Sequence, residues 1–126
     1  MDVKKTQDYY EKLSYDELCS CAYCQNYIRQ VKYEYPEIAE YLQKFGVDIE
    51  KPFEAMPLEP DEDGYIEYIA VQYIVCGESL GFEKAAVNSV NIDIADSHPA
   101  ARIKEEYFVI EIYPIRLKWV MPPISG

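Results

Sequence analysis

The segment from Tyr65 to Cys76 constrains the fold most strongly, because it is mostly apolar at both odd and even positions. Successive side chains of a β-strand point to opposite faces of the sheet. Both faces of this segment must therefore be covered, as in a central strand. The tyrosines and β-branched residues favour a strand over a helix, and Gly77 ends it.

Two later segments also have the pattern of strands. Residues 90–95 alternate between apolar and polar side chains, with Val90, Ile92 and Ile94 on the dry face. In the segment Tyr107–Trp119, the apolar positions change parity at Pro114. Because side chains alternate strictly along a strand, this change predicts a bulge or bend, with Pro114 at an edge or outside the ladder.

Helix signals are confined to the first third of the chain. The segment Ser14–Glu17 has the form of a capping box, which predicts a helix beginning at Tyr15 and running to about Tyr33. Pro36 is well placed to begin a second helix over residues 36–45. Gly46 predicts its end in a Schellman motif, with Val47 packing on Leu42.

The remaining segments are predicted as connections. Residues 47–64 carry three prolines and no sustained period, so we expect an extended surface connection with a solvated turn at Asp61–Asp63. Residues 96–99 form another predicted turn. The fold class is therefore α+β, with two N-terminal helices packed on a mainly antiparallel β-sheet. We expect a single domain over residues 1–126, helical over about 15–46 and mainly β over about 65–119.

Charge excludes two classes of partner. The chain has 12 basic and 23 acidic residues, a net charge of −11, and a pI near 4.4. Nucleic acid and anionic lipid would be repelled by such a surface, so we expect no nucleic-acid and no membrane binding. No apolar stretch typical of a signal peptide follows the first lysines, so the expected location is cytoplasmic.

Three of the four cysteines, Cys19, Cys21 and Cys24, lie within six residues. On a regular helix, at about 100° per residue, Cys21 and Cys24 are about 60° apart, whereas Cys19 points about 160° away from Cys21. The predicted helix therefore offers two sulfur ligands. The third becomes available only if residues 18–21 are unwound.

Three interpretations of these cysteines remain open. They can be small buried residues in a reduced core. They can be zinc ligands, in which case Cys76 and the only histidine, His98, are candidates to complete the shell with Cys19, Cys21 and Cys24. Finally, Cys21 and Cys24 have the C-x-x-C spacing of a redox pair.

No catalytic residue is assigned. A cysteine nucleophile would need His98 as its base, with Asp93 or Asp96 to orient the ring, but a histidine before Pro99 is more typical of a turn. The chain has no glycine-rich phosphate loop. We therefore expect binding rather than catalysis and no cofactor, with zinc as the alternative.

Tyrosine is unusually frequent, with 13 residues in the chain. Half-burial of the rings, with the hydroxyls in water, is one interpretation of them. The other is a recognition surface for a basic protein partner, because tyrosine combined with acidic residues suits such an interface. The tyrosines on the predicted helices and first strand are Tyr23, Tyr27, Tyr33, Tyr35, Tyr41, Tyr65, Tyr68 and Tyr73.

Three segments carry a resemblance: Cys21–Tyr27, Phe45–Glu54 and Gly64–Tyr68, the last beginning the strand that ends at Gly77. They resemble a group of small uncharacterised bacterial proteins that share a C-x-x-C-x-N-aromatic helix, a Gly-[Ile/Val]-Asp-x-x-Lys-Pro loop and a Gly-x-x-x-Tyr strand. The resemblance covers about residues 15–77. It implies a recurring fold and a recurring site but supplies no reaction.

Two functions follow as hypotheses. The first is a non-catalytic protein-binding or regulatory domain of the immunity or inhibitor type, with an acidic, tyrosine-bearing surface. The second is a zinc-binding or thiol-redox protein that uses the Cys19/Cys21/Cys24 cluster. Metal content and the number of free thiols distinguish the two.

Overall fold

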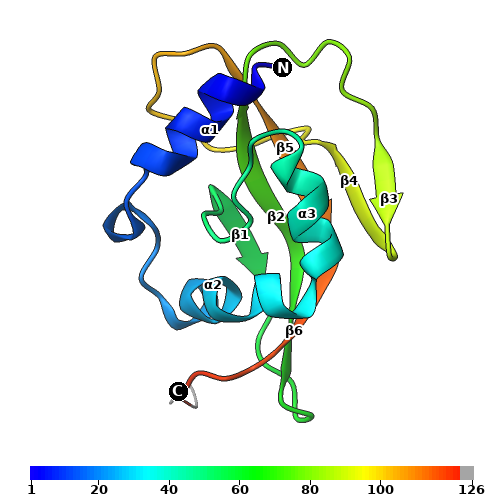
Figure 1. Ribbon diagram of the computed structural model, residues 1–126. Helices are drawn as coiled ribbons and strands as arrows, with labels where there is room; N and C mark the ends of the chain where they lie inside the picture. The colour runs from blue at the N-terminus through cyan, green and yellow to red at the C-terminus, as the bar shows by residue number, and fades with distance from the viewer. Residues whose placement is uncertain (123–126) are drawn as a thin grey trace.

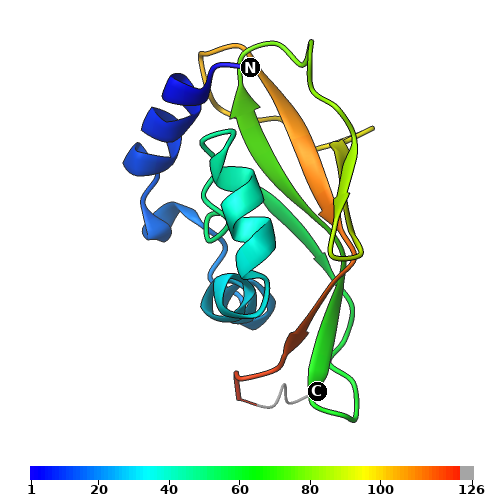
Figure 2. The same ribbon diagram turned by 45° about the vertical axis from the view of Figure 1, so that its right-hand side comes forward.

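The computed structural model describes residues 1–122; the last four residues of the predicted domain, 123–126, lie outside the described residues. The helices pack on one face of a six-stranded antiparallel sheet, which confirms the predicted α+β class (Figures 1 and 2). The helical elements are α1 (Val3–Lys12), a 3₁₀ turn η1 (Tyr15–Glu17), α2 (Ala22–Glu34) and α3 (Pro36–Gln43). The strands are β1 (Glu54–Pro57), β2 (Tyr65–Cys76), β3 (Ala85–Val87), β4 (Val90–Ile94), β5 (Tyr107–Tyr113) and β6 (Ile115–Lys118).

Strand β2 is an interior strand of the sheet, with neighbours along both edges, as predicted. It pairs with β1 along one edge and with β5 and β6 along the other, in the order β1-β2-β5-β4-β3. Its first residues alternate between exposed and buried, but every residue from Ala70 to Cys76 is buried. The two-sided apolar pattern therefore corresponds to a strand covered on both faces only in its second half.

The predicted phase change at Pro114 is a bend shared by two paired strands. Pro114 lies between β5 and β6, outside the ladder. On one side of it Ile112 pairs with Val71, and on the other Ile115 pairs with Tyr68, all four being buried. The positions of β2 in the main core also change parity, between Tyr68 and Val71. Because both paired strands change parity at the same point, their apolar side chains face the core on both sides of the bend.

The predicted helix from Tyr15 is wrong in its first third. The capping box at Ser14 forms, but it caps only η1, which ends at Glu17. Leu18 is extended, with φ −90° and ψ 162°, and α2 begins only at Ala22. A capping box fixes a first turn, and nothing in it ensures that the next turn follows.

The second predicted helix is confirmed with its end. Gly46 has φ +84° and its N–H bonds to Gln43 O at 3.0 Å, while the N–H of Val47 bonds to Leu42 O at 3.1 Å. These two bonds define a Schellman motif. Val47 and Leu42 are both buried in the core, as expected.

Helix α1 was not predicted, because its buried face consists of only Thr6 and Tyr10. It covers the edge of β2 beyond the end of β1. The Tyr10 hydroxyl donates to Ile74 O at 2.7 Å, and the N–H of Cys76 donates to Thr6 Oγ1 at 3.0 Å. Side chains of α1 thus satisfy backbone groups that a strand would otherwise pair with.

Two short strands were also missed. The expected connection 47–64 contains β1, and the loop after Gly77 contains β3. Elements of three or four residues are too short for an alternating pattern to be recognised. In addition, Ile94 at the end of β4 is 38% exposed, so it does not belong to the dry face predicted for that strand.

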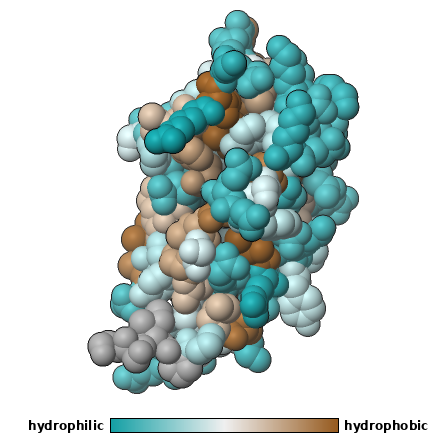
Figure 3. All heavy atoms as spheres, turned by 90° about the vertical axis from the view of Figure 1, so that its left-hand side faces the viewer, coloured by the Kyte–Doolittle hydropathy of each residue, from teal (hydrophilic) through white to brown (hydrophobic). Residues whose placement is uncertain are grey.

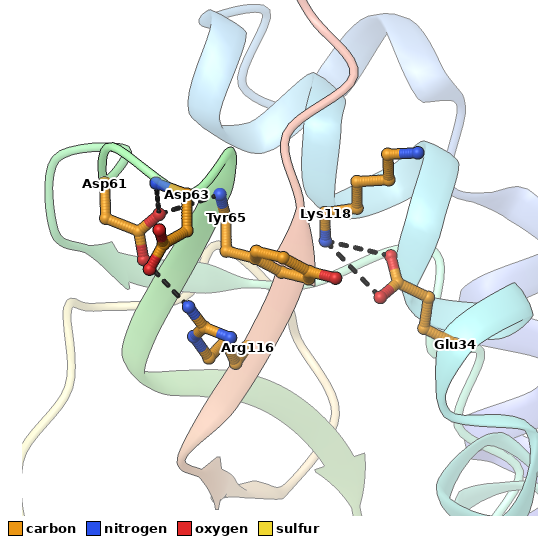
Figure 4. A network of polar contacts seen from close by, with 6 residues as sticks. All are labelled: Glu34, Asp61, Asp63, Tyr65, Arg116 and Lys118. Atoms are coloured by element: carbon orange, nitrogen blue, oxygen red, sulfur yellow. Dashed lines mark hydrogen bonds and ion pairs between the residues drawn. The ribbon is translucent and has the colours of Figure 1, made fainter.

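The acidic segment Asp61–Asp63 forms the predicted turn. Asp61 Oδ1 accepts the N–H of Asp63 at 2.9 Å and that of Tyr65 at 3.0 Å, and Arg116 pairs with the same carboxylate at 2.9 Å (Figure 4). On the other side of β6, the N–H of Lys118 bonds to the Glu34 carboxylate at 3.1 Å. The turn and α2 thereby hold β6 from two sides.

Candidate functional site

The three clustered cysteines meet at the unwound link between η1 and α2. The sulfurs of Cys19, Cys21 and Cys24 all lie within 4.8 Å of one another, and those of Cys19 and Cys21 are 3.1 Å apart. Residues 18–21 are not helical. This is the condition under which all three thiols become available, so the wrong helix prediction is also what separated Cys19 from the other two.

The cluster is built on the N-terminus of α2. Cys21 is the N-cap residue, no side chain caps this end of the helix, and Cys24 lies in its first turn. The unpaired N–H groups of a helix N-terminus carry partial positive charge. The first turn of α2 therefore presents this partial charge beside the sulfurs of Cys21 and Cys24.

Two side-chain amides of α2 fix the cluster in the fold. Gln25 Nε2 donates to the carbonyl oxygen of Cys19 at 3.0 Å and so holds the link against the helix. Asn26 is fully buried and donates to Lys118 O at 3.0 Å while accepting from the N–H of Val120 at 2.7 Å. The helix that carries Cys21 and Cys24 is thus anchored to the end of β6.

The cysteines differ in exposure and in acidity. Cys19 and Cys21 are exposed, Cys24 is half-buried and Cys76 is buried, so only Cys76 fits the interpretation as a core residue. The pKa of Cys19 is lowered, because a hydrogen bond from the backbone N–H of Cys21, and then hydrogen bonding with the side chains of Cys21 and Cys24, favour its thiolate form. Burial raises the pKa of Cys24 well above that of an ordinary thiol.

Cys76 and His98 do not join the cluster among residues 1–122. His98 is exposed, its Nδ1 lies 2.8 Å from Pro99 O, and its ring packs edge-on against Phe53 and Tyr107. It is therefore a turn histidine by its contacts. Among residues 1–122, the candidate metal ligands that the structure brings together are Cys19, Cys21 and Cys24.

The cluster offers soft ligands at suitable spacing. Zinc binds thiolate sulfur at about 2.3 Å, which in a tetrahedron places sulfurs about 3.8 Å apart. The separations here begin at 3.1 Å and stay within 4.8 Å, so small side-chain rotations suffice. Three sulfurs leave one position of a tetrahedral shell to another ligand.

A cavity of about 350 Å³ adjoins the cluster and was not predicted. Cys19 and Cys24 form part of its wall, together with residues of α1, η1, α2, β1 and β2 and with residues 101–103. Figure 3 shows the side of the molecule that is on the left in Figure 1, where brown and tan hydrophobic residues gather among teal hydrophilic ones. Because the residues of the wall come from segments far apart in the sequence, no local sequence pattern predicts the cavity.

Four of the tyrosines are part of the core. Tyr10, Tyr27, Tyr68 and Tyr73 are buried, and each hydroxyl has a hydrogen-bond partner. The raised pKa values of Tyr27 and Tyr73 are due first to this burial. Tyr33, on α2, is the contrasting case, with 82% of its surface exposed.

Comparison with known proteins adds no assignment: no family model, curated protein or solved structure matches the chain. Within residues 1–122, no helix combines the length and the apolar character needed to cross a membrane.

Proposed function

We propose that this chain is a zinc-binding protein whose ligands are Cys19, Cys21 and Cys24. The observation that carries the proposal is the convergence of the three sulfurs within 4.8 Å, at a link that the fold unwinds. Thiolates are soft ligands that select zinc or copper(I) over calcium and magnesium. Zinc is the expected occupant because its tetrahedral shell tolerates three protein ligands and one exchangeable one.

A thiol–disulfide role is the other use of such a cluster. It requires two cysteines, and Cys21 with Cys24 would serve. The hydrogen bond from Gln25 to the carbonyl of Cys19 favours the metal, because it recruits a third sulfur that a redox pair does not need. Exposure of Cys19 and Cys21 also gives an ion direct access from solvent.

Metal content tests the proposal. The chain purified without chelator is expected to hold one zinc per molecule by elemental analysis, and Cys19→Ser, Cys21→Ser and Cys24→Ser are each expected to lower that content. Cys76→Ala is the matched control, since it removes a buried thiol outside the cluster. Absence of zinc together with free thiols at Cys19, Cys21 and Cys24 would contradict the proposal.

The site is proposed to stabilise and regulate rather than to catalyse. Its three ligands join the link after η1 to the first turn of α2, so zinc would tie the N-terminal part of the chain to the main helix. Metal binding that orders such a link adds to the free energy of unfolding. Chelation is therefore expected to lower the melting temperature without abolishing the sheet.

Protein recognition is a second candidate, supported by the exposed ring of Tyr33. Near it along α3, Glu37 and Glu40 are exposed, and the net charge of −11 favours a basic partner. An immunity or inhibitor role would use such a surface. A basic partner that is retained by the wild type and lost with Tyr33→Ser would support it, whereas equal retention by both would contradict it.

A further inference from the structure

The cavity beside the cysteines has the size and character of a small-molecule site. Its volume of about 350 Å³ lies within the range of known ligand pockets. Most of the lining residues are apolar, and the charged ones are Glu17, Glu54 and Arg102. The apolar residues that line it include Leu13, Leu18, Ile28, Phe53, Ile74 and Ile103.

The cavity and the sulfurs share a boundary. Cys19 and Cys24 belong both to the metal-ligating cluster and to the cavity wall. An ion held by the three sulfurs therefore lies at the edge of the cavity, with one coordination position left for a ligand from outside the chain. A molecule in the cavity is within reach of that position.

Charge selects the chemistry of that ligand. A zinc ion with three thiolates carries a net charge of −1, and the wall adds Glu17 and Glu54 against one base, Arg102. A carboxylate or a thiolate would bring a further negative charge into an acidic site. An uncharged nitrogen donor avoids this repulsion, and imidazole nitrogen is an established partner of thiolate in zinc shells.

We propose that the cavity binds an uncharged aromatic nitrogen heterocycle, whose ring nitrogen completes the coordination of the metal held by Cys19, Cys21 and Cys24. The apolar body of the molecule lies against Leu13, Ile28 and Ile74. This inference rests on the proposed metal site. It adds a class of ligand, because the metal selects the ring nitrogen of the molecule and the apolar cavity selects its body.

Cobalt(II) in place of zinc makes the test visible, since its absorption reports both the sulfur ligands and the coordination number. The full chain loaded with cobalt is titrated with imidazole and with 4-phenylimidazole. Both are expected to shift the visible bands, with 4-phenylimidazole binding at least about tenfold more tightly because its phenyl ring enters the cavity. Equal affinities, or cobalt bands that do not respond, would overturn the inference.

A matched pair of variants tests whether the ligand binds in the cavity. Ala101→Phe fills the cavity from its wall, whereas Ala100→Phe adds the same ring at an exposed neighbouring position that does not line it. Only Ala101→Phe is expected to remove the preference for 4-phenylimidazole, and a preference that survives it would contradict the assignment. A chain that takes up no cobalt would instead overturn the proposed function, so the two failures are distinguishable.

Discussion

Gln25 Nε2 donates a hydrogen bond of 3.0 Å to the carbonyl oxygen of Cys19, from the first turn of α2 to the non-helical link before it. The bond satisfies a carbonyl that a continuous helix would have paired internally. It therefore stabilises the unwound conformation in which the sulfur of Cys19 lies beside that of Cys21. The cluster depends on a side chain that is not one of its ligands.

The first prediction concerns that bond. Gln25→Ala is expected to weaken zinc affinity about tenfold or more, as is usual when a group that orients a metal ligand is lost. Gln30→Ala is the control, because Gln30 lies on the same helix and bonds to Glu34 instead. Competition with a chromophoric chelator measures both, and equal affinities for the two variants would contradict the role given to Gln25.

The second prediction follows from the different acidities of the thiols. In the metal-free chain, alkylation of Cys19 is expected to persist to lower pH than that of Cys24, because hydrogen bonds lower the pKa of Cys19 and burial raises that of Cys24. The Cys19 thiolate is lost as the pH falls through this lowered pKa. Peptide-resolved mass spectrometry over a pH series measures the rates, and a shared pH profile would be inconsistent with the structure.

How far the sequence predicted this site can be seen at Leu18. The spacing of the cysteines singled out the cluster, and helical geometry showed that residues 18–21 had to be unwound for it to close. The capping box at Ser14 is nonetheless a local signal for the start of a helix. Leu18 instead lines the cavity, and that contact depends on packing between distant segments.

The fold was predictable where local signals sufficed. The glycine after α3 predicts the end of that helix, and the apolar run of β2 predicts a strand. Both predictions are confirmed. Helix α1 and strand β1 are stabilised by the partner strand β2, through Tyr10 and through backbone pairing. The sequence pattern of a single segment gives no information about the strand that it packs on, so α1 and β1 could not be predicted in this way.

The third prediction concerns the attachment of α2 to β6. Asn26→Ala removes a buried amide and leaves Lys118 O and the N–H of Val120 without their partner, so a loss of about 2–3 kcal/mol in the free energy of unfolding is expected. Arg29→Ala, at an exposed position of the same helix, should stay within about 0.5 kcal/mol. Urea unfolding gives both values, and similar losses would show that the amide does not anchor the helix.

The fourth prediction ranks two buried tyrosines. The Tyr73 hydroxyl donates to Ile49 O at 2.7 Å, so in its hydrogen bond with Tyr27 it is the acceptor. Tyr73→Phe leaves both a donor and a carbonyl unpaired, whereas Tyr27→Phe leaves only an acceptor. We expect the first to cost about 2–3 kcal/mol and the second about 1 kcal/mol in denaturant unfolding. The reverse order would mean that the hydroxyls are arranged differently.

The most direct measurement is the zinc K-edge X-ray absorption spectrum of the purified chain. The proposed site predicts three sulfur neighbours at about 2.3 Å and one lighter nitrogen or oxygen neighbour, with the sulfur count falling in Cys19→Ser. A shell of nitrogen and oxygen alone, or a sulfur count unchanged by Cys19→Ser, would contradict the assignment of Cys19, Cys21 and Cys24 as the ligands.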